Sequence, residues 1–193
     1  MGAPLVVLDA GHCPNGVGTN RLGACYNGLV ECAITWDICR RVYIGWTTKA
    51  AALHMTRPSY WDSPTLSERA AIANRMDATM FLSVHCNALP GSTKAEGIET
   101  LHHLGSTRGK LVAQAIQDTA VAATGARDRG LRERNDVLVL RTTKMPAAML
   151  EAGFLTRKEE AAAISTETYR NDLAAGIRLG IMEGLLAIGA IKF

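Results

Sequence analysis

Four residues of this 193-residue chain have side chains that can bind a metal ion or move a proton, and each lies where a structural element is expected to begin or end. His12 follows a short apolar run, His85 ends a second run and Glu151 ends a third. Glu31 falls in the first turn of a predicted helix that follows a long loop. Because ligands of open α/β sheets bind beyond the carboxyl ends of the strands, we expect these residues to share one edge of a sheet.

Two imidazoles and a carboxylate are a common ligand set for zinc, with the fourth position left for water. Zinc lowers the pKa of its water to about 7 and polarises a carbonyl group. A second carboxylate must then accept the proton of the water and pass it to a leaving amine. His12, Glu31, His85 and Glu151 could fill these parts, although no short motif joins them, so the prediction depends on the sheet bringing them together.

Each of the four residues also has a structural interpretation. A single histidine after a strand is commonly a hydrogen-bonded structural residue, and Glu31 alone would be a first-turn acid stabilised by the helix dipole. Glu151 could be a partner in a salt bridge, but a carboxylate that closes an apolar strand is costly to bury alone. Two histidines at equivalent strand ends, His12 and His85, move the interpretation toward function.

Two cysteines directly follow candidate ligands and could be thiolate ligands or a nucleophile. They are Cys13 and Cys86. Neighbouring side chains of an extended segment point to opposite sides, so we expect Cys86 to face away from the site that His85 faces. The chain has five cysteines, an odd number without tight spacing, which predicts no disulfide framework and favours synthesis in a reducing compartment.

Other polar residues in predicted strands are weaker candidates. Glu99, His102 and His103 could also bind a metal, and His54 stands in a short predicted strand. An alternating strand places some polar side chains in solvent, so we expect the histidines of this group at the surface.

The elements that must position these residues alternate between strand and helix. Apolar runs predict strands at residues 5–8, 53–56, 79–85, 97–102, 137–141 and 147–151. Helical spacing and capping predict helices at residues 29–44, 65–76, 109–123 and 168–188. This alternation predicts an α/β fold with a largely parallel sheet between helices, and a long loop over residues 10–28.

Three details of the helices can be read from single residues. Asn27 is the expected N-cap of the first helix, and Thr65 with Glu68 forms a capping box for the second. In the last helix Gly176, Gly180 and Gly184 recur every four residues, which predicts close packing of this helix on the sheet.

Size and composition indicate one globular domain over residues 1–193. Apolar residues make up 48% of the chain and the net charge is +3, with no block of Lys and Arg, so neither disorder nor nucleic-acid binding is expected.

The most apolar stretch, residues 179–191, contains Glu183 and is too short to span a membrane. Residues 1–4 lead directly into a strand without the pattern of a signal peptide, and a monomer is expected.

The motifs around these residues resemble the zinc-dependent N-acetylmuramoyl-L-alanine amidases of the amidase 3 family. The resemblance rests on segments that run in the family order over nearly the whole chain: residues 8–12 (Leu-Asp-Ala-Gly-His), Glu31, and residues 56–58, 66–74, 81–88, 97–100, 129–131 and 145–155. Together these segments are specific, and chance is a poor explanation for them.

The resemblance implies a twisted, mostly parallel sheet of about six strands sandwiched by helices, of the phosphorylase/hydrolase-like kind. It implies that His12, Glu31 and His85 bind zinc and that Glu151 is the catalytic acid and base. The implied reaction is hydrolysis of the peptidoglycan amide between the lactyl group of N-acetylmuramic acid and L-alanine. Such an enzyme acts on the bacterial cell wall, either as a phage endolysin made in the host cytoplasm or as a secreted enzyme without its signal.

Two departures from the family pattern leave the ligands unchanged. Family members usually have glycine where this chain has Cys13, and a small residue where it has Cys86, so the loop after His12 and the substrate preference are open. Three alternative functions also stay open: a zinc peptidase that cuts within the stem peptide, a non-catalytic peptidoglycan-binding module, and a cysteine hydrolase that pairs Cys86 with His85.

Overall fold

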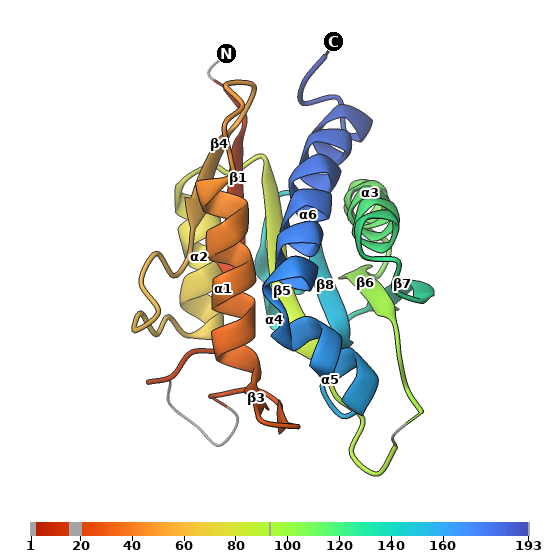
Figure 1. Ribbon diagram of the computed structural model, residues 1–193. Helices are drawn as coiled ribbons and strands as arrows, with labels where there is room; N and C mark the ends of the chain where they lie inside the picture. Colours follow the sequence, from red (N-terminus) through yellow and green to blue (C-terminus); the bar gives the residue numbers. More distant parts are fainter. Residues whose placement is uncertain (1–2, 16–20, 93, 193) are drawn as a thin grey trace.

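A six-stranded sheet forms the centre of the computed structural model, which describes residues 3–15, 21–92 and 94–192 (Figure 1). Across the sheet the strand order is β4-β1-β5-β8-β6-β7. The strands are β1 (Leu5–Ala10), β4 (Ala52–Met55), β5 (Met80–Asn87), β6 (Ile98–His103), β7 (Asp128–Arg134) and β8 (Ala147–Phe154). Residues 16–20 of the predicted long loop lie outside the described residues.

The strand directions decide which residues meet at each edge of the sheet. Strands β4, β1, β5 and β8 pair in parallel, whereas β6 runs antiparallel to β8, and β7 runs parallel to β6. The carboxyl ends of β4, β1, β5 and β8 therefore lie at the same edge of the sheet as the amino ends of β6 and β7. The residues predicted from the sequence to bind a metal ion and transfer a proton fall at or near this edge, and because of that prediction we call it the catalytic edge.

Helices cover both faces of the sheet (Figure 1). One apolar core joins the sheet to α1 (Glu31–Ile44), α3 (Thr107–Thr124) and α6 (Glu167–Ala187). A smaller apolar core on the other face joins it to α2 (Leu66–Arg75) and α4 (Leu138–Thr142). Successive side chains of β1 enter different cores, since Val6 and Leu8 belong to the first and Val7 to the second. The predicted sandwich of helices around a mostly parallel sheet is confirmed.

The remaining elements are short. Helix α5 (Lys158–Ser165) precedes α6, and a two-stranded hairpin of β2 (Cys25–Tyr26) and β3 (Leu29–Val30) leads into α1. None of the described helices is long and apolar enough to cross a membrane.

Most predicted elements are confirmed, with shifts of one to three residues at their ends, and the Thr65–Glu68 capping box is present. The predicted strand at residues 137–141 is wrong, because α4 occupies this position. Asn27 is not the N-cap of α1, which begins after Val30 without a side-chain cap. Instead, Asn27 has a φ of 51° and donates a hydrogen bond to the carbonyl oxygen of Leu155.

The glycine repeat of α6 does allow close packing, but the neighbour is mainly a helix. A Cβ atom on Gly176 would lie 2.6 Å from the carbonyl oxygen of Thr119, and one on Gly180 would lie 2.9 Å from the Cα atom of Ile116, both in α3. Only Gly184 meets a strand side chain, that of Met80. The predicted contact of this repeat with the sheet is therefore wrong at two of its three positions.

Candidate functional site

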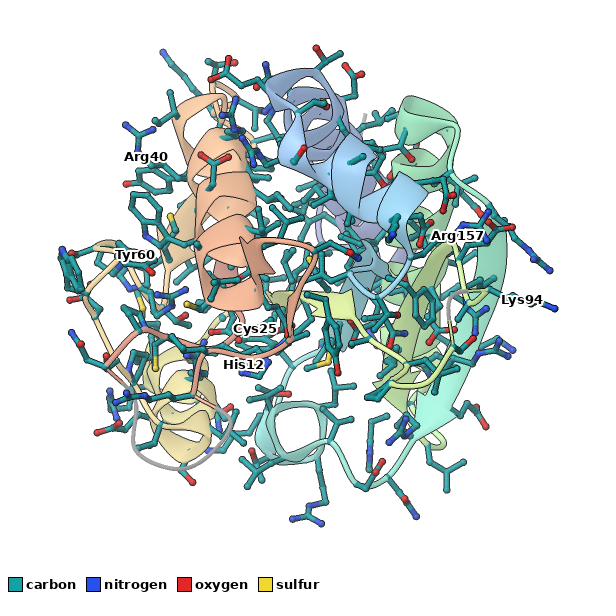
Figure 2. All side chains as sticks on the ribbon, turned by 60° about the horizontal axis from the view of Figure 1, so that its bottom comes forward. His12, Cys25, Arg40, Tyr60, Lys94 and Arg157 are labelled. Atoms are coloured by element: carbon teal, nitrogen blue, oxygen red, sulfur yellow. The ribbon has the colours of Figure 1, made fainter. Side chains whose placement is uncertain are left out.

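The three predicted metal ligands come together at the catalytic edge. His12 lies two residues after β1, Glu31 is the first residue of α1, and His85 lies near the end of β5. Their ligand atoms all lie within 4.8 Å of one another. They line a cavity of about 560 Å³, and Glu151 of β8 lines the same cavity. Figure 2 looks toward this edge, with His12 near the centre of the view.

The geometry of the three side chains fits one metal ion. Nε2 of His12 lies 3.3 Å and Nδ1 of His85 lies 3.0 Å from the same atom, Oε1 of Glu31. Zinc–ligand distances of about 2.0–2.2 Å with tetrahedral angles place two ligand atoms of one ion roughly 3.3 Å apart. The two imidazole rings lie 4.9 Å apart in an edge-to-face arrangement, so both can present a nitrogen to a shared point.

Glu31 is held in place by backbone donors. The amide of Ala24 donates to Oε2 at 2.7 Å, and the amide of Cys86 donates to Oε1 at 3.0 Å. Burial raises the pKa of Glu31, but the contacts with His12 and His85 outweigh burial and lower this pKa well below its usual range. The carboxylate form, which binds metal ions, is therefore the stable form at neutral pH.

Two glycines leave the space that the site occupies. A Cβ atom on Gly11 would collide with the imidazole ring of His85. A Cβ atom on Gly23 would collide with the carboxylate of Glu31 and would lie 2.7 Å from Cδ2 of His12. Gly23 also has a φ of 73°, so a side chain at this position is disfavoured both by the collision and by the backbone conformation.

Two buried arginines hold the backbone around His12 through hydrogen bonds to its carbonyl oxygens. His12 has a φ of 58°, which is uncommon for a residue other than glycine. Arg69 of α2 donates to the carbonyl oxygen of His12 at 2.7 Å and also to that of Ala10. Arg57 donates to the carbonyl oxygens of Ala10 and Gly11. These charge-assisted bonds stabilise the unusual turn after β1.

Asp9 compensates the charge of Arg69 inside the protein. Oδ1 of Asp9 lies 2.7 Å from Nη1 of Arg69 and accepts a hydrogen bond from Thr56, and Oδ2 accepts one from Ser83. Burial raises the pKa of Asp9, but Arg69 and the two hydroxyl groups outweigh burial and lower it. Periodicity alone does not reveal Arg57 and Arg69, although both lie in segments that resemble the amidase 3 family.

Glu151 lies on β8 directly beside His85 in the parallel register of β5 and β8. Its Oε2 atom is buried and has no hydrogen-bond partner among the described residues. Burial, together with the negative charges of Glu31 and Glu99, raises the pKa of Glu151 well above its ordinary value. A carboxyl group with a raised pKa binds a proton more strongly than an ordinary glutamate, which is the property of a general acid and base.

Glu99 of β6 extends the row of polar groups beyond Glu151. The antiparallel register pairs Glu99 with Glu151, and Nε of Arg129 lies 2.8 Å from Oε2 of Glu99. Asn87 donates to the other oxygen of Glu99 at 2.8 Å. Glu99 is thus an ion-paired neighbour of the cavity and does not belong to the group of three ligands.

Cys25 and Cys86 line the same cavity, but among the described residues the group of possible ligands contains no cysteine and no histidine besides His12 and His85. Cys86 is buried in the larger apolar core, as expected, and burial raises the pKa of its thiol well above the ordinary value. Cys13 is also buried. His102 was expected at the surface, and this prediction is wrong, because its strand β6 lies between β8 and β7 and leaves it only 1% exposed. His103 and His54 are half-buried.

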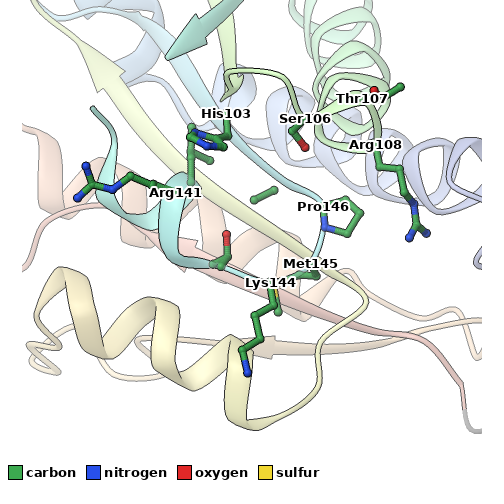
Figure 3. A pocket seen from close by; sticks show the side chains of 11 residues that line it. His103, Ser106, Thr107, Arg108, Arg141, Lys144, Met145 and Pro146 are labelled. Atoms are coloured by element: carbon green, nitrogen blue, oxygen red, sulfur yellow. The ribbon is translucent and has the colours of Figure 1, made fainter. Parts of the chain in front are cut away.

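A second pocket of about 360 Å³ lies at the opposite edge of the sheet (Figure 3). It is lined in part by His103 at the end of β6, and Figure 3 shows Arg108, Arg141 and Lys144 around it. None of the four predicted site residues lines this pocket, so the chemistry predicted from the sequence is confined to the catalytic edge.

Comparison with known proteins shows which family this chain resembles over most of its length. The chain is 35% identical over 188 residues to an endolysin of Bacillus phage SPP1, covering 93% of this chain and 65% of the endolysin. It is 30% identical over 182 residues to the N-acetylmuramoyl-L-alanine amidase LytC of Bacillus subtilis (strain 168), covering 92% of this chain and 35% of that protein. The chain therefore spans less than two thirds of the length of these two relatives.

Solved structures show the same architecture. The structure of an N-acetylmuramoyl-L-alanine amidase from Clostridium difficile 630 matches with a TM-score of 0.86 and 32% identity, covering 94% of this chain and 96% of that chain. The catalytic domain of CwlV from Bacillus (Paenibacillus) polymyxa var. colistinus matches with a TM-score of 0.85 and 30% identity, covering 95% and 99%. Residues 6–183 match the family described as N-acetylmuramoyl-L-alanine amidase, and the chain therefore belongs to this amidase 3 family.

Proposed function

We propose that this chain is a zinc-dependent N-acetylmuramoyl-L-alanine amidase, and that residues 1–193 form a single catalytic domain. Its proposed substrate is the peptidoglycan amide between the lactyl group of N-acetylmuramic acid and L-alanine. The observation that carries the proposal is the meeting of His12 and His85 at one carboxylate oxygen of Glu31, with Glu151 lining the same cavity.

In this proposal His12, Glu31 and His85 hold the zinc ion. Bound zinc supplies a Lewis acid that polarises the scissile carbonyl and makes water more acidic. Glu151 takes a proton from water at its carboxylate and gives it to the nitrogen of L-alanine, which leaves as an amine. The raised pKa of Glu151 suits its role as a proton carrier, since a carboxylate with a higher pKa is a stronger base toward water.

The names of the relatives favour the amidase over the alternatives. A zinc peptidase that cuts within the stem peptide would use the same four side chains, but LytC and the matched Clostridium difficile structure are described as amidases. The raised pKa of the buried Cys86 thiol disfavours a cysteine hydrolase, because the thiolate is the reactive form. The proposed place of action is the bacterial cell wall, and the similarity to a phage endolysin supports a bacteriolytic role.

The proposal is tested by the chemistry of the released ends. Purified protein is incubated with bacterial cell walls, and new amino termini and new reducing sugar ends are measured with and without a zinc chelator. We expect new amino termini on L-alanine only, no new reducing ends, and loss of activity with the chelator that added zinc restores.

Two variants complete this test. Glu151→Gln is expected to reduce the rate by at least about 10²-fold, because general acid–base catalysis commonly contributes 10²–10⁴-fold. Glu159→Gln, a change on the exposed side of α5, is the matched control and should leave the rate unchanged. New amino termini on residues other than L-alanine would contradict the amidase and indicate a peptidase. Binding to cell walls without any release would indicate a non-catalytic binding module.

A further inference from the structure

Three aromatic side chains form a cluster beside the catalytic edge. The rings of Trp36 and Tyr60 lie 5.7 Å apart, and those of Tyr60 and Trp61 lie 5.0 Å apart, both edge to face. We call Trp36, Tyr60 and Trp61 the aromatic cluster. Trp61 is 65% exposed, so the cluster presents an indole ring to solvent. Aromatic side chains that are packed together and partly open to solvent have a flat apolar face that another molecule can cover.

A hydrogen-bonded turn holds Trp61 in this exposed position. The amide of Trp61 donates to the hydroxyl group of Ser59, and its carbonyl accepts a hydrogen bond from Ser63. The carboxylate of Asp62 accepts a hydrogen bond from the amide of Ser59 at 2.7 Å. The indole is therefore displayed by a preorganised turn, which reduces the entropy lost when a ligand binds.

The aromatic cluster is joined to the backbone of the zinc ligands. The hydroxyl group of Tyr60 lies 3.7 Å from the sulfur atom of Cys32, the residue that follows Glu31. Arg57 donates to the carbonyl oxygens of both Tyr60 and Cys32, and it also binds the carbonyl oxygens that precede His12. The position of the cluster relative to the site is therefore fixed.

The strand order fixes the sequence in which the site residues and the aromatic cluster lie along the catalytic edge. Glu151 lies on β8, His85 on β5 and His12 after β1, and the segment with Tyr60 and Trp61 follows β4, the next strand in the same direction. If Glu151 gives its proton to the leaving amine, the peptide lies on the β8 side. The carbonyl side of the amide, which carries the sugar, then faces toward β4 and the aromatic cluster.

We propose that the aromatic cluster binds the glycan strand of peptidoglycan, with Trp61 and Tyr60 stacking on the C–H faces of its sugar rings. This inference rests on the proposed amidase function and adds a sugar subsite to it. The polar groups around the rings suit the hydroxyl and acetamido groups of a sugar: the hydroxyl of Tyr60, the carboxylate of Asp62, and the guanidinium of Arg40, which lies 5.8 Å from the centre of the Trp36 ring.

The test measures binding separately from hydrolysis. The probe is peptide-free glycan strand from peptidoglycan, and its binding is followed by tryptophan fluorescence and by sedimentation. Trp61→Ala is expected to weaken binding about tenfold, the usual cost of truncating a central aromatic contact, whereas Trp61→Tyr keeps most of the affinity. Tyr43→Ala is the matched control, because Tyr43 is 49% exposed near the far end of α1. Thermal unfolding checks that each variant is folded.

Kinetics give a second readout. On polymeric cell wall Trp61→Ala is expected to raise KM about tenfold at unchanged kcat, and on a muramoyl peptide with a single sugar it should change neither. Equal glycan binding by Trp61→Ala and Tyr43→Ala would overturn the proposal. Loss of affinity for a free stem peptide instead of the glycan, or loss of self-association in Trp61→Ala, would also overturn it. Glycan binding that depends on Trp61 in a protein without amidase activity would keep the subsite and reject only the proposed reaction.

Discussion

At the scale of single residues, the buried side chain of Glu151 lowers the stability of the folded protein. Its Oε2 atom is buried without a hydrogen-bond partner among the described residues, and the carboxylates of Glu31 and Glu99 lie close enough to raise its pKa further. A buried polar atom without a partner destabilises a fold by roughly 1–3 kcal/mol. Such a residue is explained by its chemistry, since packing alone favours an uncharged side chain within an apolar strand such as β8.

The first prediction follows from this cost. In metal-free protein at neutral pH, Glu151→Gln should raise the free energy of unfolding by roughly 0.5–2 kcal/mol, because burial and the neighbouring carboxylates penalise the charged form of Glu151 and a neutral amide carries no such penalty. Urea unfolding measures the stability, and Glu183→Gln, a change at an exposed position of α6, is the control that should have no effect. A destabilised Glu151→Gln would mean that the carboxylate is compensated in the folded protein.

A second prediction concerns the space around the ligands. Gly23→Ala places a methyl group against Glu31 and His12 and should weaken zinc affinity by about 10–100-fold, the range found when the support of a ligand is disturbed. Gly28→Ala is a matched control, because Gly28 has a similar φ of 79° but no atom within 4 Å of the added Cβ position. Isothermal titration with zinc separates the two variants, and equal losses would show that backbone strain alone is responsible.

At the scale of elements, the turn after β1 depends on α2. Arg69 reaches from α2 to the carbonyl oxygens of Ala10 and His12, and Asp9 compensates its charge. The capping box of Thr65 and Glu68 fixes the start of this helix, and so the position of Arg69 one residue later. A helix on the rear face of the sheet therefore controls the backbone of a ligand at the catalytic edge.

A third prediction follows from the lowered pKa of Asp9. A carboxyl group whose pKa is lower in the folded than in the unfolded protein stabilises the fold above its unfolded pKa of about 3.9, and this stabilisation is lost as the pH falls through the folded value. Asp9→Asn should therefore cost about 3–5 kcal/mol near neutral pH, as for other broken buried ion pairs, and less in acid. Urea unfolding across pH measures this difference.

Asp172→Asn, at an exposed position of α6, is the control for Asp9→Asn and should behave as the unchanged protein at every pH. If the stability difference between Asp9→Asn and the unchanged protein stayed constant from neutral pH into acid, Asp9 would not be the charged partner of Arg69.

At the scale of the whole molecule, the ligand set joins separate parts of the fold. His12 follows β1, Glu31 begins α1 and His85 lies in β5, so the three donors come together only in the folded chain. An ion that binds them binds the native state far better than the unfolded chain, and it stabilises the native state in proportion to its occupancy.

The fourth prediction is therefore a linkage between zinc and stability. Free zinc at about 100 times its Kd should raise the free energy of unfolding by about 2.7 kcal/mol. His85→Ala should remove this gain, while His54→Ala, a change of a half-buried histidine in β4, should keep it. Thermal or urea unfolding with and without zinc measures the effect, and an equal gain in both variants would place the zinc outside the proposed site.

Much of this protein can be predicted from its sequence, because local patterns carry the information. Apolar runs and helical spacing located most strands and helices, and the capping box marked the start of α2. The predicted strand at residues 137–141 failed because a short apolar run fits a strand and a buried helix equally well. Asn27 failed as an N-cap because its side chain finds a tertiary partner in Leu155.

The candidate site, too, has features that the sequence predicts and features that depend on the tertiary structure. The sequence by itself determined the types of the four side chains and the elements near them, which predict their chemistry, although β5 continues two residues beyond His85 and β8 three residues beyond Glu151. Only the tertiary structure decided that Glu31 meets His85, 54 residues away in the chain, at 3.0 Å, and that β6 runs antiparallel and buries His102. Such contacts depend on the closure of long chain segments and on the sheet register, which no local pattern specifies.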